Sequence, residues 1–494
     1  MVTRDTSGRP ADPASTSRTG QQHAGWALAL TSVSFFMVAL DALVVITALP
    51  RIRAGLGGSL STLEWTVNAY TLTFAAGIIA GAAIGDRLGR RRTYVAGLLL
   101  FTAASAACAL APSTGALIAA RAVQGVGAAF VTPLSLTILT GAYPAHRRGT
   151  IVGIWGGLGG LAIACGPLVG GAVVNGLNWH WIFWVNVPIG LAAAGLSLLR
   201  LTESRGRAAR LDVPGVLLAA AAATALAWGL VRTTDAGWGN AQVIVALTAG
   251  AVLIGGLAAW ERRAAEPMLP PGLLRIRAFT AANLAGFCSF AAITSAAFLM
   301  SQYFQLGQGY SPLATGLRFL PWTATPTLIA PLAGAVADRI GTRPLIATGL
   351  FLQAAGLAYI AVVASTTTSY VQIVVPLVVA GIGISMSIPA TPTAALGAIR
   401  PQDAGKASGV LNTLQRFGAV FGVAIVSAVF AGSGQLTAPA AVTSGFRPAL
   451  AVSAAISLLG AASALAIGKA VRARSGAAGE PAPGRPSVQV AAKV

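Results

Sequence analysis

Long apolar runs alternate with short polar segments along almost the whole chain. Each run is close to the roughly 20 residues that an α-helix needs to cross a bilayer. The basic residues fall mainly in the short segments between the runs. The pattern predicts fourteen helices, at 26–49, 65–85, 93–111, 115–138, 150–174, 181–199, 213–232, 242–260, 279–303, 315–337, 344–364, 370–396, 407–432 and 447–468.

The two ends of the chain differ from this pattern. Residues 1–25 and 469–494 are polar and rich in small residues, so we expect disordered tails there. The first apolar run is longer than the roughly 7–15 residues of a signal-peptide core, and we expect it to remain attached to the protein.

The composition supports a membrane protein. Hydrophobic residues make up 55% of the chain, charged residues only 9%, and the mean hydropathy is +0.74. So few charges cannot cover a soluble globule of 494 residues. Most of the 33 Lys and Arg residues fall in the tails and in alternate loops, which favours a cell-membrane protein with both termini in the cytoplasm. The net charge of +20 therefore reflects topology, and we expect no nucleic-acid partner.

The reactive side chains are few and scattered. Cys108, Cys165 and Cys288 all lie in apolar runs without metal-ligand spacing, so they read as small buried hydrophobes. The three histidines form no cluster and accompany no nucleophile motif. We therefore expect no metal, no cofactor and no enzymatic activity.

A repeat organises the helices. Three sets of residues recur further along the chain, the first at an offset of 252 residues and the other two at 256. The pairs are Asp86, Arg87, Gly89 and Arg91 with Asp338, Arg339, Gly341 and Arg343; Gly125, Gly127 and Pro133 with Gly381, Gly383 and Pro389; and Gly149 and Gly153 with Gly405 and Gly409. Parallel six-helix halves are a recognised transporter design, although a duplication can also build a mere scaffold.

The repeat predicts an all-α polytopic membrane protein with two six-helix halves and two additional central helices. The predicted divisions are a cytoplasmic tail at 1–25, a first bundle at 26–200, a linker with two extra helices at 201–278, a second bundle at 279–468 and a cytoplasmic tail at 469–494.

Two charged residues stand inside predicted spans. Asp41 lies well within the first run, where a carboxylate costs about 2.5–3.5 kcal/mol on insertion, so it is expected to face an internal cavity. The alternative is an interfacial position. Arg121 lies on the fourth predicted helix, followed by Gln124, and a guanidinium there requires partners; the alternative to a functional role is a satisfied structural arginine. The repeat counterpart of Arg121 is Leu377, and nothing in 279–303 matches Asp41, so both charges belong to the first half.

Three further groups of residues are candidates for function. The loops after the repeated helix suggest gating, or simply charge that sets topology, and comprise Asp86, Arg87, Gly89, Arg90, Arg91, Asp338, Arg339, Gly341 and Arg343. The Gly-rich fifth helix can bend and pack tightly around Gly166, Pro167, Gly170 and Gly171. Four polar residues could contact substrate, line the interface between the halves, or be structural: Gln124 on the fourth predicted helix, and Asn412, Gln415 and Arg416 on a late helix. The remaining acids are expected in loops, at helix edges or in the tails.

These stretches together resemble the major facilitator superfamily, and specifically its fourteen-helix drug:proton antiporter branch of multidrug efflux transporters. The resembling segments are Leu40-Asp41 with Ala48-Leu49-Pro50, Gly85 to Arg92, Arg121 to Gly127, Gly166 to Gly171 and Trp181 to Gly190. One departure is Ala82, where the superfamily loop motif usually begins with Gly. The resemblance implies that the Asp86 loop is a conformational latch, that Arg121 assists proton transfer near the helix 1 acid, and that Gly166-Pro167-x-x-Gly170-Gly171 marks an antiporter.

The expected function is proton-driven efflux of amphipathic, lipophilic or cationic organic compounds by alternating access. In this reading Asp41 carries the proton, Arg121 modulates it, and the protein acts as a monomer in the bilayer on a small-molecule substrate. Two alternatives stay open. One is an exporter of a single metabolite or organic anion, because Arg121 and Arg416 could bind a carboxylate; the other is a transport-inactive membrane sensor or scaffold.

Overall fold

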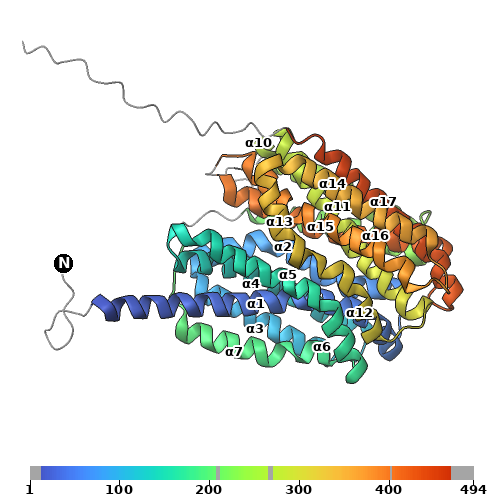
Figure 1. The fold of residues 1–494 in the computed structure, drawn as a ribbon, viewed down its shortest axis with the longest axis horizontal. Coiled ribbons are helices and arrows are strands. Elements are labelled where there is room, and N and C mark those ends of the chain that lie inside the picture. Colours follow the sequence, from blue (N-terminus) through green and yellow to red (C-terminus); the bar gives the residue numbers. More distant parts are fainter. Residues whose placement is uncertain (1–12, 207–211, 265–270, 401–402, 469–494) are drawn as a thin grey trace, which may run out of the picture.

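The structure is a computed structural model that describes residues 13–206, 212–264, 271–400 and 403–468. Its described part is built from helices that run side by side (Figure 1). The first group consists of α1 (Pro13–Leu56), α2 (Leu60–Leu88), α3 (Arg90–Ala109), α4 (Thr114–Ala142), α5 (Ala145–Gly176), α6 (Trp181–Trp184) and α7 (Asn186–Arg200). Next along the chain come α8 (Val213–Ala236), α9 (Ala241–Glu261) and α10 (Pro271–Leu274).

The second group begins after α10. It consists of α11 (Arg277–Gln302) with its π-helical extension η1 (Tyr303–Gly307), α12 (Pro312–Thr323), α13 (Thr325–Ile340), α14 (Thr342–Val363), α15 (Tyr370–Gly397), α16 (Ala404–Ser433) and α17 (Pro439–Ala464). The two groups form two bundles that lie one above the other in Figure 1.

Many helices pack against partners that are distant along the chain. In the first bundle α4 packs against α1, α2 and α3, while α1 also packs against α5. In the second bundle α11 packs against α16 and α17, and α14 against α15 and α17. The α8–α9 hairpin packs through α8 against both α2 and α16, so it touches both bundles. The predicted divisions at 200 and 278 remain predictions.

Three helices differ most from the sequence prediction, and one of them, predicted at 181–199, is divided at Val185 into α6 and α7. Helix α1 begins at Pro13 rather than near Trp26, because turns added to an established helix avoid the cost of nucleation. The helix predicted at 315–337 is divided at Ala324 into α12 and α13. Pro321 and Pro326 flank this division, and a proline lacks the N–H that a continuous helix requires.

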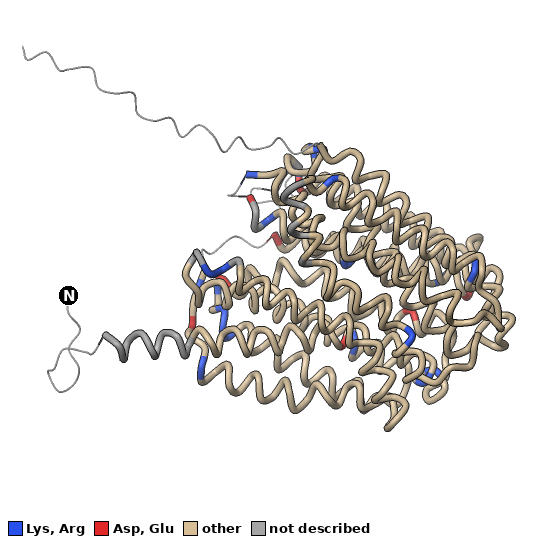
Figure 2. Tube along the Cα trace, viewed as in Figure 1, with Lys and Arg blue, Asp and Glu red and all other residues tan. Residues whose placement is uncertain are grey.

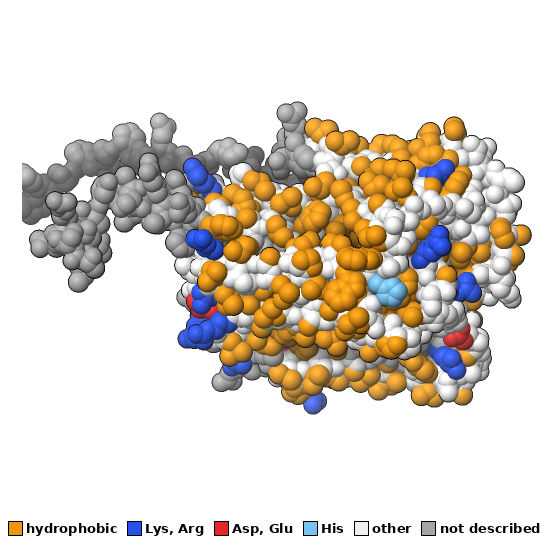
Figure 3. All heavy atoms as spheres, turned by 90° about the horizontal axis from the view of Figure 1, so that it is seen from below, with side chains coloured by type: hydrophobic (Ala, Val, Ile, Leu, Met, Phe, Trp, Pro, Cys, Tyr) orange, Lys and Arg blue, Asp and Glu red, His pale blue; other side chains and the backbone are white. Residues whose placement is uncertain are grey.

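The described helices are suited to a bilayer. Thirteen of them are long and apolar enough to cross a membrane, and α12 with α13 supplies the fourteenth expected span as two shorter pieces. Most Lys and Arg positions on the chain trace lie toward the two ends of the helices, with few between them (Figure 2). The surface between those ends is largely hydrophobic on the face drawn in Figure 3. The chain is therefore a multi-pass membrane protein.

The two bundles pack against each other along α2 and α16 and are hydrogen-bonded toward one end. We call the end that carries the α2–α3 loop and residues 86–92 the basic end, and the other the opposite end. Hydrogen bonds between the bundles lie toward the opposite end: Arg53 donates to the Leu436 carbonyl (2.9 Å), Ser301 to Ile46 (2.9 Å) and Gln305 to Thr47 (2.8 Å). Thr323 of α12 donates to the Ala164 carbonyl of α5 (3.1 Å). In the described part of the chain, the two bundles are thus in contact at the opposite end, and this end is closed.

Candidate functional site

The two charges predicted inside the membrane form an ion pair. Arg121 Nη1 lies 2.5 Å from Asp41 Oδ2, and only 3% of Asp41 and 1% of Arg121 are exposed. The Arg121 Nε also donates to the Thr66 carbonyl of α2 at 3.2 Å. Gly125 makes this geometry possible, because a Cβ there would collide with the Tyr70 carbonyl and hold α4 away from α2.

Neutral donors complete the coordination of Asp41. Gln124 Nε2 donates to Asp41 Oδ1 at 3.0 Å, and Asn186 Nδ2 donates to the same oxygen at 2.9 Å. Gln124 Oε1 in turn accepts from Arg121 Nη1 at 2.7 Å. Asn186 also donates to Ser105 Oγ at 3.0 Å. The Asp41 carboxylate therefore receives one charged hydrogen bond and two neutral ones, donated by side chains of α4 and α7.

An aromatic pair connects this cluster to the second bundle. The Arg121 guanidinium lies 4.2 Å from the centre of the Tyr70 ring, and Tyr70 lies 5.8 Å from Phe74, ring centre to ring centre. Arg416 of α16 places its guanidinium 4.5 Å from the Phe74 ring. One arginine from each bundle thus makes a cation–π contact with neighbouring aromatic residues of α2.

The other two polar residues predicted on α16 lie elsewhere. Asn412 is exposed, and its side chain donates to the Ser408 carbonyl at 2.8 Å. Gln415 is buried beside Gly286 of α11, within the second bundle. Of the three late polar residues, only Arg416 has a described contact with the first bundle.

The predicted gating loop is held within the first bundle. Asp86 Oδ1 accepts from Arg90 Nε at 2.8 Å, and Gly89 adopts φ 114°, a conformation that favours glycine. Glu203, after α7, accepts from the backbone N–H groups of Arg91 (2.9 Å) and Arg92 (3.2 Å). A carboxylate at these two N–H groups satisfies the N-terminus of α3.

The remaining loop residues are placed less fully. Arg87 is exposed, and Arg91 Nη1 donates to the Leu201 carbonyl at 3.0 Å. In the second copy Gly341 adopts φ 85°, a positive value like that of its counterpart Gly89. Arg343 lies in the first turn of α14. The side chains of Asp338 and Arg339 lie outside the described residues.

The Gly-Pro motif of α5 lies where helices approach closely. A Cβ on Gly166 would meet Leu43 of α1, and one on Gly170 would meet Val44 and Thr47. A Cβ on Gly171 would collide with the Pro312 carbonyl at the start of α12. Gly316 of α12 is equally close to the Pro167 carbonyl, so the motif lets α5 and α12 join the two bundles.

Sequence reasoning missed several partners. Asn186, Ser105 and Tyr70 surround the ion pair, and only their place in apolar runs could have drawn attention to them. Glu64 was placed just outside the predicted helix 65–85, but it lies within α2 and is fully buried.

Comparison with known proteins agrees with this architecture. Residues 31–271 and 282–492 match the Major Facilitator Superfamily. The chain belongs to that superfamily. Its members are membrane transporters of small molecules, so this chain is a transporter of the superfamily, as the resemblance of its motifs predicted.

Three similar proteins come from Mycobacterium, Streptomyces and Amycolatopsis. The chain is 35% identical to Multidrug resistance protein Stp of Mycobacterium tuberculosis (strain CDC 1551 / Oshkosh), covering 82% of this chain and 75% of that protein. It is 35% identical to the Methylenomycin A resistance protein of Streptomyces coelicolor, covering 81% and 84%. It is also 35% identical to the Cephamycin export protein CmcT of Amycolatopsis lactamdurans, covering 86% and 88%.

A solved structure supports the superfamily fold. A POT family transporter superposes with a TM-score of 0.67 over 88% of this chain and 94% of that one, at 16% identity. At this identity the similarity concerns the fold alone.

Proposed function

We propose that this transporter exports amphipathic organic compounds in exchange for protons. The observation that carries the proposal is the sealed cluster of Asp41 with Arg121, Gln124 and Asn186, because a buried carboxyl that gains or loses a proton changes every bond in it. Relatives of this chain that are named for drug resistance and antibiotic export support the outward direction of transport.

The proton acts through the bonds of Asp41. When Asp41 is ionised, it holds Arg121 by a charge-assisted hydrogen bond. When Asp41 takes up a proton, that bond weakens, while Arg121 keeps Gln124 Oε1 and the Thr66 carbonyl as acceptors. Substrate that binds one protonation state better than the other shifts the balance between the two conformations, which is the basis of coupling.

The direction of the cycle follows from the proposed orientation. We assign the basic end and both termini to the cytoplasm, because Lys and Arg concentrate in loops there. The structure, closed at the opposite end, is then the state that receives substrate from the cytoplasm or the inner leaflet. Protons are the coupling ion, the chain acts as a monomer, and no cofactor or enzymatic step is required.

A narrower substrate range is the second candidate. Several relatives are named for one compound, among them methylenomycin A, cephamycin and tetracenomycin C. The protein would then export one metabolite, including an anionic one that Arg416 helps to bind.

The experiment is proton flux in proteoliposomes across a panel of lipophilic cations, neutral antibiotics and organic anions. The proposal expects substrate-dependent proton movement with several amphipathic compounds, and its loss in Asp41→Asn at equal amounts of folded protein. Movement with a single compound selects the narrow exporter. Undiminished proton movement in Asp41→Asn would show that another group carries the proton.

A further inference from the structure

Glu64 of α2 is a buried acid outside the Asp41 cluster. None of its surface is exposed. Thr234 Oγ1 of α8 donates to Glu64 Oε1 at 3.3 Å, while Oε2 has no hydrogen-bond partner among the described residues. A carboxyl group buried in this way requires an explanation, because leaving its charge unsatisfied inside a protein is costly.

Glu64 lies on a different face of α2 from the residue that contacts the Asp41 cluster. That residue is Tyr70, whose ring lies beside Arg121, and positions six residues apart on an α-helix differ by about 120° around its axis. Two turns further along the same face, Leu72 packs with Ala227 of α8 and Val420 of α16. Glu64 therefore lies where the first bundle, the extra hairpin and the second bundle meet.

The charged groups near Glu64 do not neutralise it. Asp235 on α8 is its acidic neighbour, and Ser427 is its neighbour on α16. The cation of this region, Arg232, is directed to Asp235 (3.9 Å) and Gln242 (3.3 Å). Within the described part of α2, α8 and α16, no Lys or Arg forms an ion pair with Glu64. The Glu64 carboxyl is thus fully buried without a neutralising cation among the described residues of these helices.

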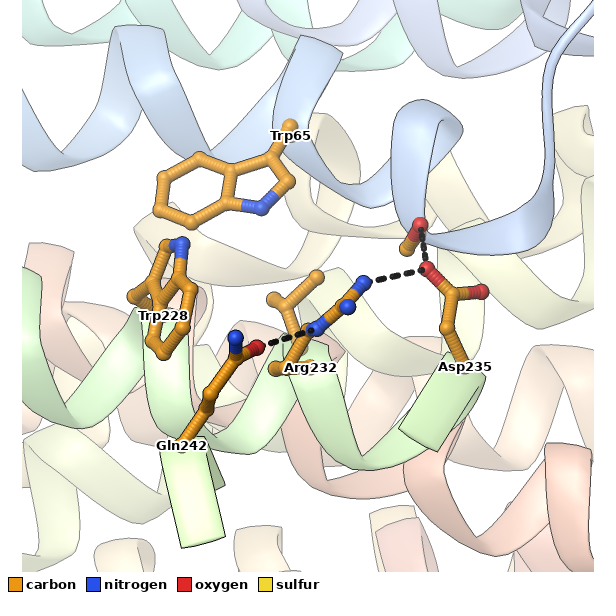
Figure 4. Close-up of a pocket in the computed structure, with 7 residues that line it drawn as sticks. Trp65, Trp228, Arg232, Asp235 and Gln242 are labelled. Carbon is orange, nitrogen blue, oxygen red and sulfur yellow. Dashed lines mark hydrogen bonds and ion pairs between the residues drawn. The ribbon is translucent and has the colours of Figure 1, made fainter. Parts of the chain in front are cut away.

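A cavity leads toward this site from the opposite end. Its volume is about 220 Å³, and it is lined by Trp65, Trp228, Arg232 and Asp235 among others (Figure 4). Ser61, one turn before Glu64, donates to Asp235 across it at 2.7 Å. Trp65 and Asp235 are the direct chain neighbours of Glu64 and Thr234, so only a short distance separates the buried carboxyl from this cavity.

We propose that Glu64 is a second proton-binding site that controls closure at the opposite end. The carboxylate takes up a proton from water at that end when α2, α8 and α16 come together, and the acid returns it when α2 and α16 separate. The proposal rests on the alternating access of the proposed function. It assigns Glu64 to the gate, whereas Asp41 carries the coupled proton.

The test measures closure directly, without transport. Spin labels are attached at Gly115→Cys and Thr366→Cys in a cysteine-free chain, one on each bundle at the opposite end. A Cβ at Gly115 meets nothing within 4 Å, and Thr366 is exposed, so labels fit at both. Distances are measured by pulsed electron paramagnetic resonance across a pH series in nanodiscs.

The expected result is a shift toward longer distances as the pH rises. Glu64→Gln, which keeps the shape of the neutral acid, should remain at the short distance at every pH. Asp403→Asn is the matched control at the basic end, and it should retain the shift. An unchanged pH-dependent shift in Glu64→Gln would refute the proposal.

Two further arms separate this proposal from the proposed function. Asp41→Asn with Glu64 intact should lose substrate-dependent proton flux but keep a pH-dependent distance shift. A chain that shows the Glu64-dependent distance shift but no proton flux with any substrate would refute the proposed exporter and leave the proposed gate intact.

Labelling of Glu64 by dicyclohexylcarbodiimide, a reagent for protonated carboxyls in apolar sites, tests the same group in the folded wild-type chain. Failure to label Glu64 in the closed state at any pH would also refute the proposal.

Discussion

Replacing Arg121 by Gln tests the buried ion pair most directly. The change removes the 2.5 Å bond to Asp41 and the 3.2 Å bond to the Thr66 carbonyl, but Gln124 and Asn186 still donate to the carboxylate. Removing one partner of a buried pair leaves an uncompensated charge and typically costs about 3–5 kcal/mol. We expect a loss of that size in the free energy of unfolding. Asp41→Asn should cost a comparable amount, because it leaves Arg121 buried without its carboxylate.

The double variant supplies the decisive comparison. The double variant Asp41→Asn with Arg121→Gln has no charge in the cluster. Replacing a buried ion pair by two uncharged residues often changes the free energy of unfolding little. We expect it to lose less than about 2 kcal/mol, well below the sum of the two single changes. Unfolding in mixed dodecyl sulfate micelles gives these free energies.

The matched control is the same cycle on Arg400 and Asp403. Their ion pair is 3.1 Å long, but 75% of the Arg400 side chain is exposed. Exposed pairs contribute about 0–1 kcal/mol, so the control cycle should show little coupling. If the losses in the Asp41–Arg121 cycle are additive, so that its coupling free energy is no larger than that of the control cycle, the sealed ion pair is refuted.

Three other changes probe the loop, the helix junction and the support of α3. Asp86→Asn should slow the transport cycle and preserve substrate binding, because Asp86 lies at the basic end beside Arg90; parallel binding and flux assays check this, and lost binding in folded protein contradicts it. Gly171→Val should favour separation at the opposite end, because its side chain collides with the Pro312 carbonyl; the Gly115 and Thr366 labels should move apart, and an unchanged distance contradicts it. Glu203→Gln should lower the free energy of unfolding by about 1 kcal/mol, because it removes the negative charge at the N-terminus of α3. Asp403→Asn is the control, and its effect on the free energy of unfolding, expected to be no larger, gives the background.

Hydropathy was sufficient to predict most of the fold. A bilayer requires long apolar helices, so the spans and their order follow from the runs themselves. The break at Ala324 was missed because the apolar run is continuous across it, and only Pro321 and Pro326 distinguish it locally. The helical start at Pro13 was missed because composition alone separates polar from apolar residues, and a polar segment can also be helical.

The site was predictable in part for a similar reason. Asp41 and Arg121 stand out because charges inside spans need partners, and each is the other's best partner. Asn186 could not be assigned in the same way, since its contact with Asp41 depends on the rotation of α7 relative to α1. Glu64 was misplaced by the usual uncertainty of one or two residues at a helix end, which here decides between surface and interior.

The repeat explains why the charged chemistry belongs to one bundle. At the repeat offset Arg121 corresponds to Leu377, which is fully buried, so the second bundle keeps the helix packing but not the ion pair. Its contribution is Arg416, which lies over Phe74 next to the ring that supports Arg121. Tyr70, which contacts Arg121, lies beside Phe74 on α2, and Phe74 contacts Arg416 of the second bundle. In the proposed cycle, a proton that weakens the Arg121–Asp41 bond therefore acts close to a contact between the bundles. In the proposed exchange of drug for proton, this short path is the physical reason why a proton bound in one half can alter how the two halves meet.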